Sequence, residues 1–226
     1  MHRIVGMKTS LLTAAALALG VGAIVTSSIG PAEPTHRLPA PTLATASAGA
    51  SETAYFAGGC FWGVEGVFEQ VKGVTSAVSG YGNGRTGVGY DAVSSGTTGN
   101  AETVKIIFDP RQVSYARLLQ IYFSVVTDPT TLNYQGPDHG PQYRSALFVT
   151  SPMQARQARA YIAQLSGAHA FGKPIVTTVE AYRSFTVAET EHQNFMARNP
   201  SYPYIVYNDA PKLAALRKLY PAIVKR

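Results

Sequence analysis

Cys60 is the only cysteine of the chain, and it lies in the run Gly-Gly-Cys-Phe-Trp-Gly. An apolar run at residues 54–57 precedes it, and apolar residues spaced three and four apart follow it over residues 64–71. This pattern predicts a strand, a tight glycine turn and a helix with the sulfur at its N-terminus. The helix dipole there favours a thiolate, so we expect a lowered thiol pKa. A reactive thiol beside the aromatic rings of Phe61 and Trp62 suits a small, partly apolar substrate.

Glu102 is the first candidate for acid chemistry. It follows a glycine-rich segment and begins a β-prone run at residues 103–108. Burial at this position would raise the carboxyl pKa and let the side chain donate a proton. An exposed glutamate at a strand end is the alternative, and the sequence leaves both open.

Two tyrosines and one aspartate lie in long polar loops. The hydroxyls of Tyr90 and Tyr143 have the chemistry to bond an oxyanion or a polarised S=O group, although packing is the usual role in a chain with thirteen tyrosines. Asp138 lies among turn residues, where it would ordinarily bond its own backbone. His192 is a candidate base for Cys60, with a solvated helix face as the alternative. The histidines show no metal-ligand spacing, so we expect no metal site.

The order of predicted elements is strand, helix, two strands, helix, strand, helix, strand and a helical tail. Ser114 is a candidate N-cap, Pro152 a candidate first helical residue, and residues 175–179 a candidate strand. Residues 189–198 and 212–220 are predicted to be short helices. Long loops cover residues 84–100 and 128–142. This order predicts an α+β fold, a two-layer sandwich of a mixed β-sheet with helices packed on it. We expect a ferredoxin-like core with long loops.

The first fifty residues are predicted to be separate from the domain. A basic start precedes an apolar stretch at residues 11–29, which is typical of a signal peptide or a membrane anchor. Residues 31–50 are rich in Pro, Ala, Ser and Thr, so we expect a disordered linker. These features predict an exported protein, periplasmic or extracytoplasmic, with anchoring to the inner membrane left open.

Residues 51–226 are predicted to form one catalytic domain. Three of the nineteen basic residues and one of the thirteen acidic residues precede it, which leaves the domain a net charge of about +4. The basic residues are scattered, which argues against nucleic-acid binding. A single cysteine excludes an internal disulfide. We expect a monomer.

Several motifs together resemble one known family. The Gly-Cys-Phe-Trp-Gly run is the most specific, and the chain is similar to peptide methionine sulfoxide reductase A over residues 53–207. The further matching segments are residues 80–81, 90–93, 95–102, 108–110, 128–133, 135–140 and 142–145.

The resemblance implies reduction of the S epimer of methionine sulfoxide, free or in proteins, as repair after oxidative damage. It implies that Cys60 is the nucleophile and Glu102 the proton donor to the sulfoxide oxygen. Tyr90 and Tyr143 would bond that oxygen, and Asp138 would orient the substrate or a water. Phe61 and Trp62 would hold the substrate methyl group. Oxygen transfer would leave methionine and a sulfenic acid on Cys60.

The chain departs from the family pattern near its C-terminus. Many members carry resolving cysteines there, whereas residues 198–204 of this chain contain no sulfur. Turnover therefore needs an external thiol, either a thioredoxin-like protein or a small thiol, and no prosthetic cofactor. In an exported protein, that electron supply must also be exported or span the membrane.

Three other classes of function are compatible with a reactive thiol. A thiol peroxidase also passes through a sulfenic acid but needs no Phe-Trp pocket. A cysteine hydrolase or acyltransferase needs a histidine base such as His192. A holdase that binds oxidised proteins would not need Cys60 at all.

Overall fold

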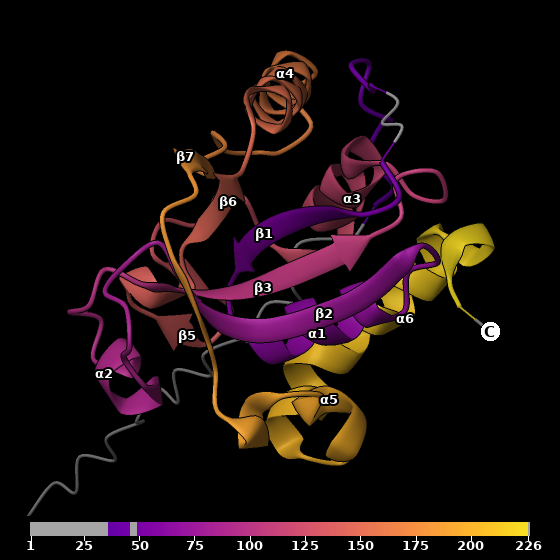
Figure 1. Ribbon diagram of the computed structural model, residues 1–226. Helices are drawn as coiled ribbons and strands as arrows, with labels where there is room; N and C mark the ends of the chain where they lie inside the picture. The colour runs from indigo at the N-terminus through magenta and orange to yellow at the C-terminus, as the bar shows by residue number, and fades with distance from the viewer. Residues whose placement is uncertain (1–35, 46–48, 226) are drawn as a thin grey trace, which may run out of the picture. The chain divides into compact units, whose positions relative to one another are not determined.

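The computed structural model describes residues 36–45 and 49–225. Its central sheet has six strands in the order β7-β6-β1-β3-β2-β8 (Figure 1). Only the β6–β7 pair among these described strands is parallel, so the sheet is mixed, as predicted. The strands are β1 (Glu52–Gly58), β2 (Val74–Gly82), β3 (Ala101–Phe108), β6 (Ser145–Val149), β7 (Thr178–Ala181) and β8 (Phe185–Val187).

The helices fill the connections between these strands. The order β6-β1-β3-β2, with α1 and α3 as its crossovers, is the ferredoxin-like core and confirms the predicted fold class. A two-stranded ribbon, β4 (Tyr134–Gln135) and β5 (Asp138–His139), lies outside the main sheet. The α-helices are α1 (Phe61–Glu69), α2 (Tyr90–Ser94), α3 (Tyr115–Ile121), α4 (Pro152–Gly167), α5 (Phe195–Arg198) and α6 (Ala210–Leu219).

The alternation of side chains along β1 separates the two faces of the sheet. Phe56 points into the main core, where its ring lies 5.5 Å from Phe68 of α1 and 5.8 Å from Tyr115 of α3. Tyr55 points to the opposite face and stacks on Tyr182 with the ring centroids 4.4 Å apart. In Figure 1, α1 lies under β2 with α6 beside it. The helices therefore form a layer on one face of the sheet.

Local sequence signals account for the starts of α3 and α4. The Ser114 hydroxyl accepts a hydrogen bond from the Arg117 N–H at 3.1 Å, which confirms the predicted N-cap of α3. Pro152 begins α4, and the Ser151 hydroxyl caps that helix. The loop at residues 84–100 also contains the short helix α2, which the sequence did not predict.

Two predicted elements have different boundaries in the structure. The strand predicted at residues 175–179 begins only at Thr178, because the Val176 N–H bonds the Pro129 carbonyl of a neighbouring loop at 2.8 Å. The helix predicted at residues 189–198 is broken at Asn194, whose φ is +53°. A 3₁₀ helix, Thr190–His192, precedes this break and α5 follows it.

Part of the predicted linker is packed on the domain, which corrects the expectation of disorder for residues 36–45. Leu38 is 2 % exposed and belongs to the main core. Its carbonyl accepts a hydrogen bond from the Gln120 side chain at 2.6 Å, and its N–H donates to the Ser124 hydroxyl at 3.3 Å. The Tyr161 hydroxyl bonds the Pro39 carbonyl at 2.8 Å. We call residues 36–45 the N-terminal strap.

The predicted leader at residues 11–29 lies outside the described residues. Within the described ranges, no helix is both long and apolar enough to span a membrane.

Candidate active site

Cys60 occupies the N-cap position of α1, as its glycine turn predicted. Gly59 before it has φ +93°, and a Cβ at Gly59 would lie 2.6 Å from the Gln135 side chain, so both conformation and space require glycine. The thiol is 7 % exposed. Burial raises its pKa well above the ordinary value, and the charges of Glu102 and Asp209 raise it further, while the Trp62 N–H lowers it. The expected low pKa is therefore wrong, because desolvation outweighs the helix terminus.

Glu102, at the start of β3, is 2 % exposed. Its Oε2 accepts a hydrogen bond from the Phe61 N–H at 3.0 Å, which fixes the carboxyl next to the first turn of α1. Burial raises the Glu102 pKa to about 8 in spite of this bond. The side chain therefore keeps its proton at neutral pH, and the alternative of an exposed strand end is wrong.

Tyr90 and Tyr143 come together from the two long loops. Tyr90 is the first residue of α2, and Tyr143 ends the 3₁₀ helix Pro141–Tyr143. Burial raises the pKa of both hydroxyls, and the neighbouring charge of Glu102 is the next cause for each. The structure thus brings both predicted tyrosines to the Glu102 side of the thiol.

Asp138, in β5, is half-buried, and burial raises its pKa. Its carboxylate accepts a hydrogen bond from the Tyr204 hydroxyl. Asp138 therefore links its loop to the C-terminal segment, and the interpretation of a turn residue bonded to its own backbone is wrong.

The two aromatic residues after the cysteine have different environments. Phe61 is 1 % exposed, in the core beside Tyr81 and His192. Trp62 is half-buried and stacks on Phe195 with the ring centroids 3.8 Å apart. Its indole N–H donates to Nδ1 of His192 at 3.3 Å.

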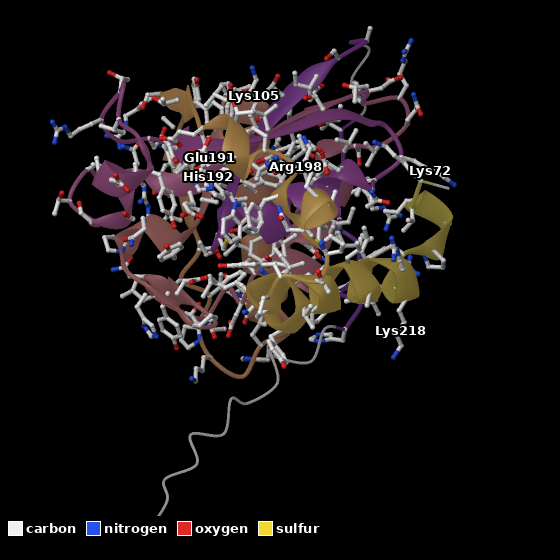
Figure 2. The ribbon with its side chains drawn as sticks, turned by 90° about the horizontal axis from the view of Figure 1, so that it is seen from below. Lys72, Lys105, Glu191, His192, Arg198 and Lys218 are labelled. Atoms are coloured by element: carbon white, nitrogen blue, oxygen red, sulfur yellow. The ribbon has the colours of Figure 1, made fainter. Side chains whose placement is uncertain are left out.

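His192 itself is 9 % exposed, so it does not lie on a solvated helix face. Arg198 fixes this segment by donating to the backbone carbonyls of Gln193 and Glu191 at 3.1 and 2.8 Å. Figure 2 labels Arg198 together with Glu191, whose carbonyl it bonds. The imidazole of His192 accepts the hydrogen bond from Trp62, which argues against His192 as the base of a cysteine hydrolase.

Comparison with known proteins identifies the family of this chain. Residues 52–222 match the family model of peptide methionine sulfoxide reductase. A relative from Mesorhizobium japonicum, peptide methionine sulfoxide reductase MsrA 2, is 55 % identical over 76 % of this chain and 89 % of its own length. The chain belongs to the peptide methionine sulfoxide reductase A family.

Other relatives and solved structures agree. The Synechocystis reductase MsrA 2 is 45 % identical over 90 % of this chain and 95 % of its own. The fold is similar to reduced Mxr1 of Saccharomyces cerevisiae, with a TM-score of 0.63, 29 % identity, and coverage of 71 % of this chain and 92 % of that one. Methionine sulfoxide reductase A of Corynebacterium diphtheriae gives a TM-score of 0.59 at 29 % identity over 77 % and 89 % of the two chains. The predicted family and the predicted activity, that of a peptide-methionine (S)-S-oxide reductase, are confirmed.

Three residues of this reductase were missed by the sequence reasoning. Glu189 accepts hydrogen bonds from the Tyr81 hydroxyl at 2.6 Å and from the Tyr90 N–H at 2.9 Å, and so positions the start of α2. Tyr204 and Asp209 come from the C-terminal segment. The one available signal was Gly63, because a glycine inside a helical pattern indicates a close neighbour. That neighbour is Asp209, whose Oδ1 would lie 2.0 Å from a Cβ at Gly63.

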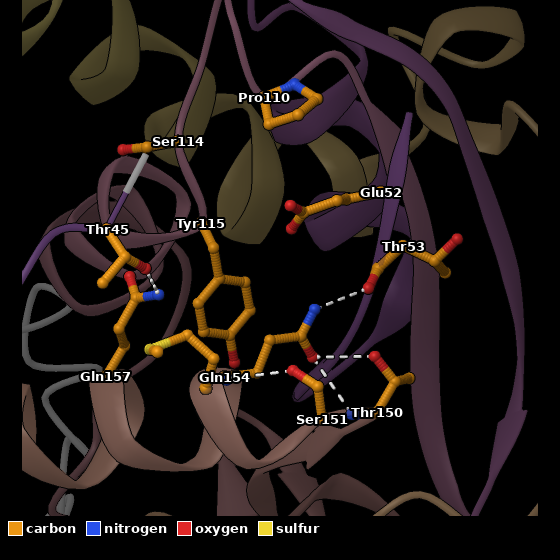
Figure 3. A pocket seen from close by; sticks show the side chains of 11 residues that line it. Thr45, Glu52, Thr53, Pro110, Ser114, Tyr115, Thr150, Ser151, Gln154 and Gln157 are labelled. Carbon is orange, nitrogen blue, oxygen red and sulfur yellow. Dashed lines mark hydrogen bonds between the residues drawn. The ribbon is translucent and has the colours of Figure 1, made fainter. Parts of the chain in front are cut away.

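A cavity of about 410 Å³ lies away from the reductase site, at the opposite end of β1 from Cys60. Glu52 and Thr53 line it, together with Gln154, whose side chain bonds the Thr53 carbonyl at 2.8 Å (Figure 3). Among the residues that the structure describes, no group of three His, Cys, Asp or Glu side chains is placed to hold a metal ion.

Proposed function

We propose that Cys60 is the nucleophile of the reductase and that Glu102 is its proton donor. The sulfur of Cys60 attacks the sulfoxide sulfur while Glu102 protonates the oxygen, which is otherwise a poor leaving group. The oxygen then passes to Cys60 and the thiol proton returns to the Glu102 carboxylate, so that the products are methionine and a sulfenic acid. The observation that carries this proposal is the buried Glu102 carboxyl, with a pKa of about 8, next to the thiol. A neutral carboxylic acid is a group that can donate a proton at neutral pH.

The remaining site residues orient the substrate. We infer that Tyr90 and Tyr143 bond the sulfoxide oxygen, because their hydroxyls lie beside Glu102 and keep their protons. Asp138 orients the substrate or a water. The half-buried ring of Trp62 contacts the substrate methyl group, and the buried ring of Phe61 supports it from the core side.

The sulfenic acid is reduced by an external thiol, since the chain has a single cysteine. A thioredoxin-like protein or a small thiol attacks the Cys60 sulfur, forms a mixed disulfide and releases water, and a second thiol restores Cys60. No prosthetic group takes part in these steps. Oxidised proteins and free methionine sulfoxide are the proposed substrates.

We propose that the reductase is exported and works as a monomer. The basic start and the apolar stretch at residues 11–29 support a signal peptide or an anchor in the inner membrane. Its reductant would then work in the same oxidising compartment.

The test is the reduction of the two separated epimers of a methionine sulfoxide peptide, with dithiothreitol, by the protein and by Cys60→Ser. We expect reduction of the S epimer alone and its loss in the variant. Intact mass after one turnover without reductant should show one added oxygen. Retained activity in Cys60→Ser would contradict the assignment of Cys60 as the nucleophile. A loss of two hydrogens in the mass would contradict the sulfenic acid as the product.

A further inference from the structure

Tyr204 is a third tyrosine at the site, besides Tyr90 and Tyr143. Its hydroxyl donates a hydrogen bond to the Asp138 carboxylate. Its ring stands edge-on to Trp62, with the centroids 5.7 Å apart and an interplanar angle of 87°. Trp62 directly follows the first residue of α1, whose N-cap is Cys60. Tyr204 is thus fixed through both its ring and its hydroxyl beside the reactive thiol.

The segment that follows holds Tyr204 in place. Residues Ile205–Asp209 form a π-helical turn, and Ile205 is 1 % exposed. Asp209, at the end of the turn, is fully buried against Gly63 of α1, and its Oδ1 accepts from Lys212 at 3.2 Å. The Asn208 side chain also donates to the Tyr204 carbonyl at 3.1 Å. The position of Tyr204 is therefore set by buried contacts rather than by a free chain end.

Three tyrosine hydroxyls lie around Cys60, and Tyr204 differs from the other two in its bonded partner. The charge of Glu102 is the strongest influence, after burial, on Tyr90 and Tyr143. For Tyr204, burial raises the hydroxyl pKa first, the charge of Cys60 next, and the bond to Asp138 after that. The charge of Cys60 thus acts on all three hydroxyls, and Tyr204 is the one whose hydroxyl is bonded to the Asp138 carboxylate.

The two chemical steps at Cys60 need separate protons. The first step protonates the sulfoxide oxygen, and the second must protonate the oxygen of the sulfenic acid before it can leave as water. Because the chain contains no second cysteine, this second step takes place on the buried Cys60 itself when an outside thiol attacks. A hydroxyl fixed beside the sulfur and linked to a carboxylate is suited to that step.

We propose that Tyr204, held by Asp138, bonds the oxygen of the Cys60 sulfenic acid and donates the proton with which it leaves as water. This proposal rests on the proposed function. The thiol R–SH loses its proton to Asp138 and forms an S–S bond to Cys60, while the S–O bond breaks. Tyr204 gives its proton to the leaving oxygen and regains one from Asp138. The net reaction consumes one thiol and yields a mixed disulfide and water.

The experiment separates the two steps in Tyr204→Phe. The rate of the first step is measured from the methionine formed in one turnover of the S epimer without reductant. The rate of the second step is that of mixed-disulfide formation after 2-mercaptoethanol is added to the sulfenic acid. Intact-mass measurements monitor this reaction. We expect the first rate to stay within about twofold and the second to fall by roughly 10²-fold, as for the loss of a proton donor. The control is Tyr207→Phe, in the same turn but 79 % exposed, which should change neither rate.

Equal losses in both steps would overturn the proposal, since Tyr204 would then act at the sulfoxide or on the structure of the site. An unchanged second step would overturn it as well, as would an equal slowing of that step in Tyr207→Phe. If the unsubstituted protein forms no methionine in the first step, the proposed function fails. The sulfenic acid is then made with one equivalent of hydrogen peroxide, and the second step tests Tyr204 by itself.

Discussion

At the scale of single residues, burial keeps the Cys60 thiol and the Glu102 carboxyl protonated at neutral pH. Cys60 and Glu102 are 7 % and 2 % exposed, and desolvation is the main cause of the raised pKa of each. The carboxyl ionises at about pH 8, and its charge then disfavours the thiolate beside it. The resting enzyme at neutral pH therefore holds a thiol and a neutral acid. Such a thiol is protected from unspecific oxidation, because the thiolate is the reactive form.

Glu102→Gln removes that charge, so the pKa of Cys60 should fall. The rate of Cys60 alkylation by iodoacetamide, measured against pH, should rise at a lower pH in this variant than in the unsubstituted protein. Reduction of the S epimer should fall by roughly 10²-fold or more, because the proton donor is gone. Glu69→Gln, at the other end of α1, is the control and should alter neither measurement. An alkylation profile that stays in place in Glu102→Gln would contradict the coupling of the two groups.

At the scale of elements, the site depends on a close contact between α1 and the C-terminal turn. Asp209 is fully buried against Gly63, and its Oδ2 has no hydrogen-bond partner. Burying a carboxyl in this way is costly, and the bond to Lys212 only partly offsets it. The contact nevertheless sets the position of Tyr204, five residues earlier in the chain.

Gly63→Ala would place a Cβ 2.0 Å from Oδ1 and 2.6 Å from Cγ of Asp209. We expect a loss of roughly 1–3 kcal/mol in the free energy of unfolding, because the buried turn must move, and slower reduction of the sulfenic acid. The matched control is Gly167→Ala in α4, where a new Cβ meets nothing within 4 Å and should be neutral or stabilise by up to ~1 kcal/mol. Chemical denaturation measures both. Equal stability of the two variants would refute the contact.

At the scale of the whole molecule, the folded unit is larger than its family match. The match begins at residue 52, whereas the N-terminal strap at residues 36–45 lies against α3, α4 and the segment before Pro221. Arg37 lies over the ring of Tyr220 at 5.4 Å, and the Tyr220 hydroxyl bonds Ser124 at 2.8 Å. The strap is thus in contact with the C-terminal part of the chain through Tyr220.

Leu38→Ala removes the side chain that inserts the strap into the core. We expect a loss of about 3 kcal/mol in the free energy of unfolding, typical of a buried leucine. Leu132→Ala, at a position that is 65 % exposed, should change it by less than about 0.5 kcal/mol. A chain that begins at residue 51 should also melt below one that begins at residue 36. Identical melting of these two chains would mean that the strap does not stabilise the domain.

The sequence by itself determined the family and the ferredoxin-like order of elements, and it supplied the candidate site residues around Cys60. These follow from local signals, namely a glycine turn before a helix, apolar periodicity and motifs that lie within single loops. Glu102 was found as a candidate acid in this way, from its position at the start of a core strand, but the sequence left its burial open and the structure decided it.

Only the tertiary structure decided the burial of the thiol, the partner of Asp138 and the positions of Tyr204, Asp209 and Leu38. The pKa of Cys60 depends on how many segments close over it, and a helix N-terminus read from sequence contains no information about that desolvation. Tyr204 meets Asp138 across 66 residues of chain, and Leu38 meets Gln120 across 82. Such long-range contacts have no periodicity to reveal them, because they arise from the packing of the whole core.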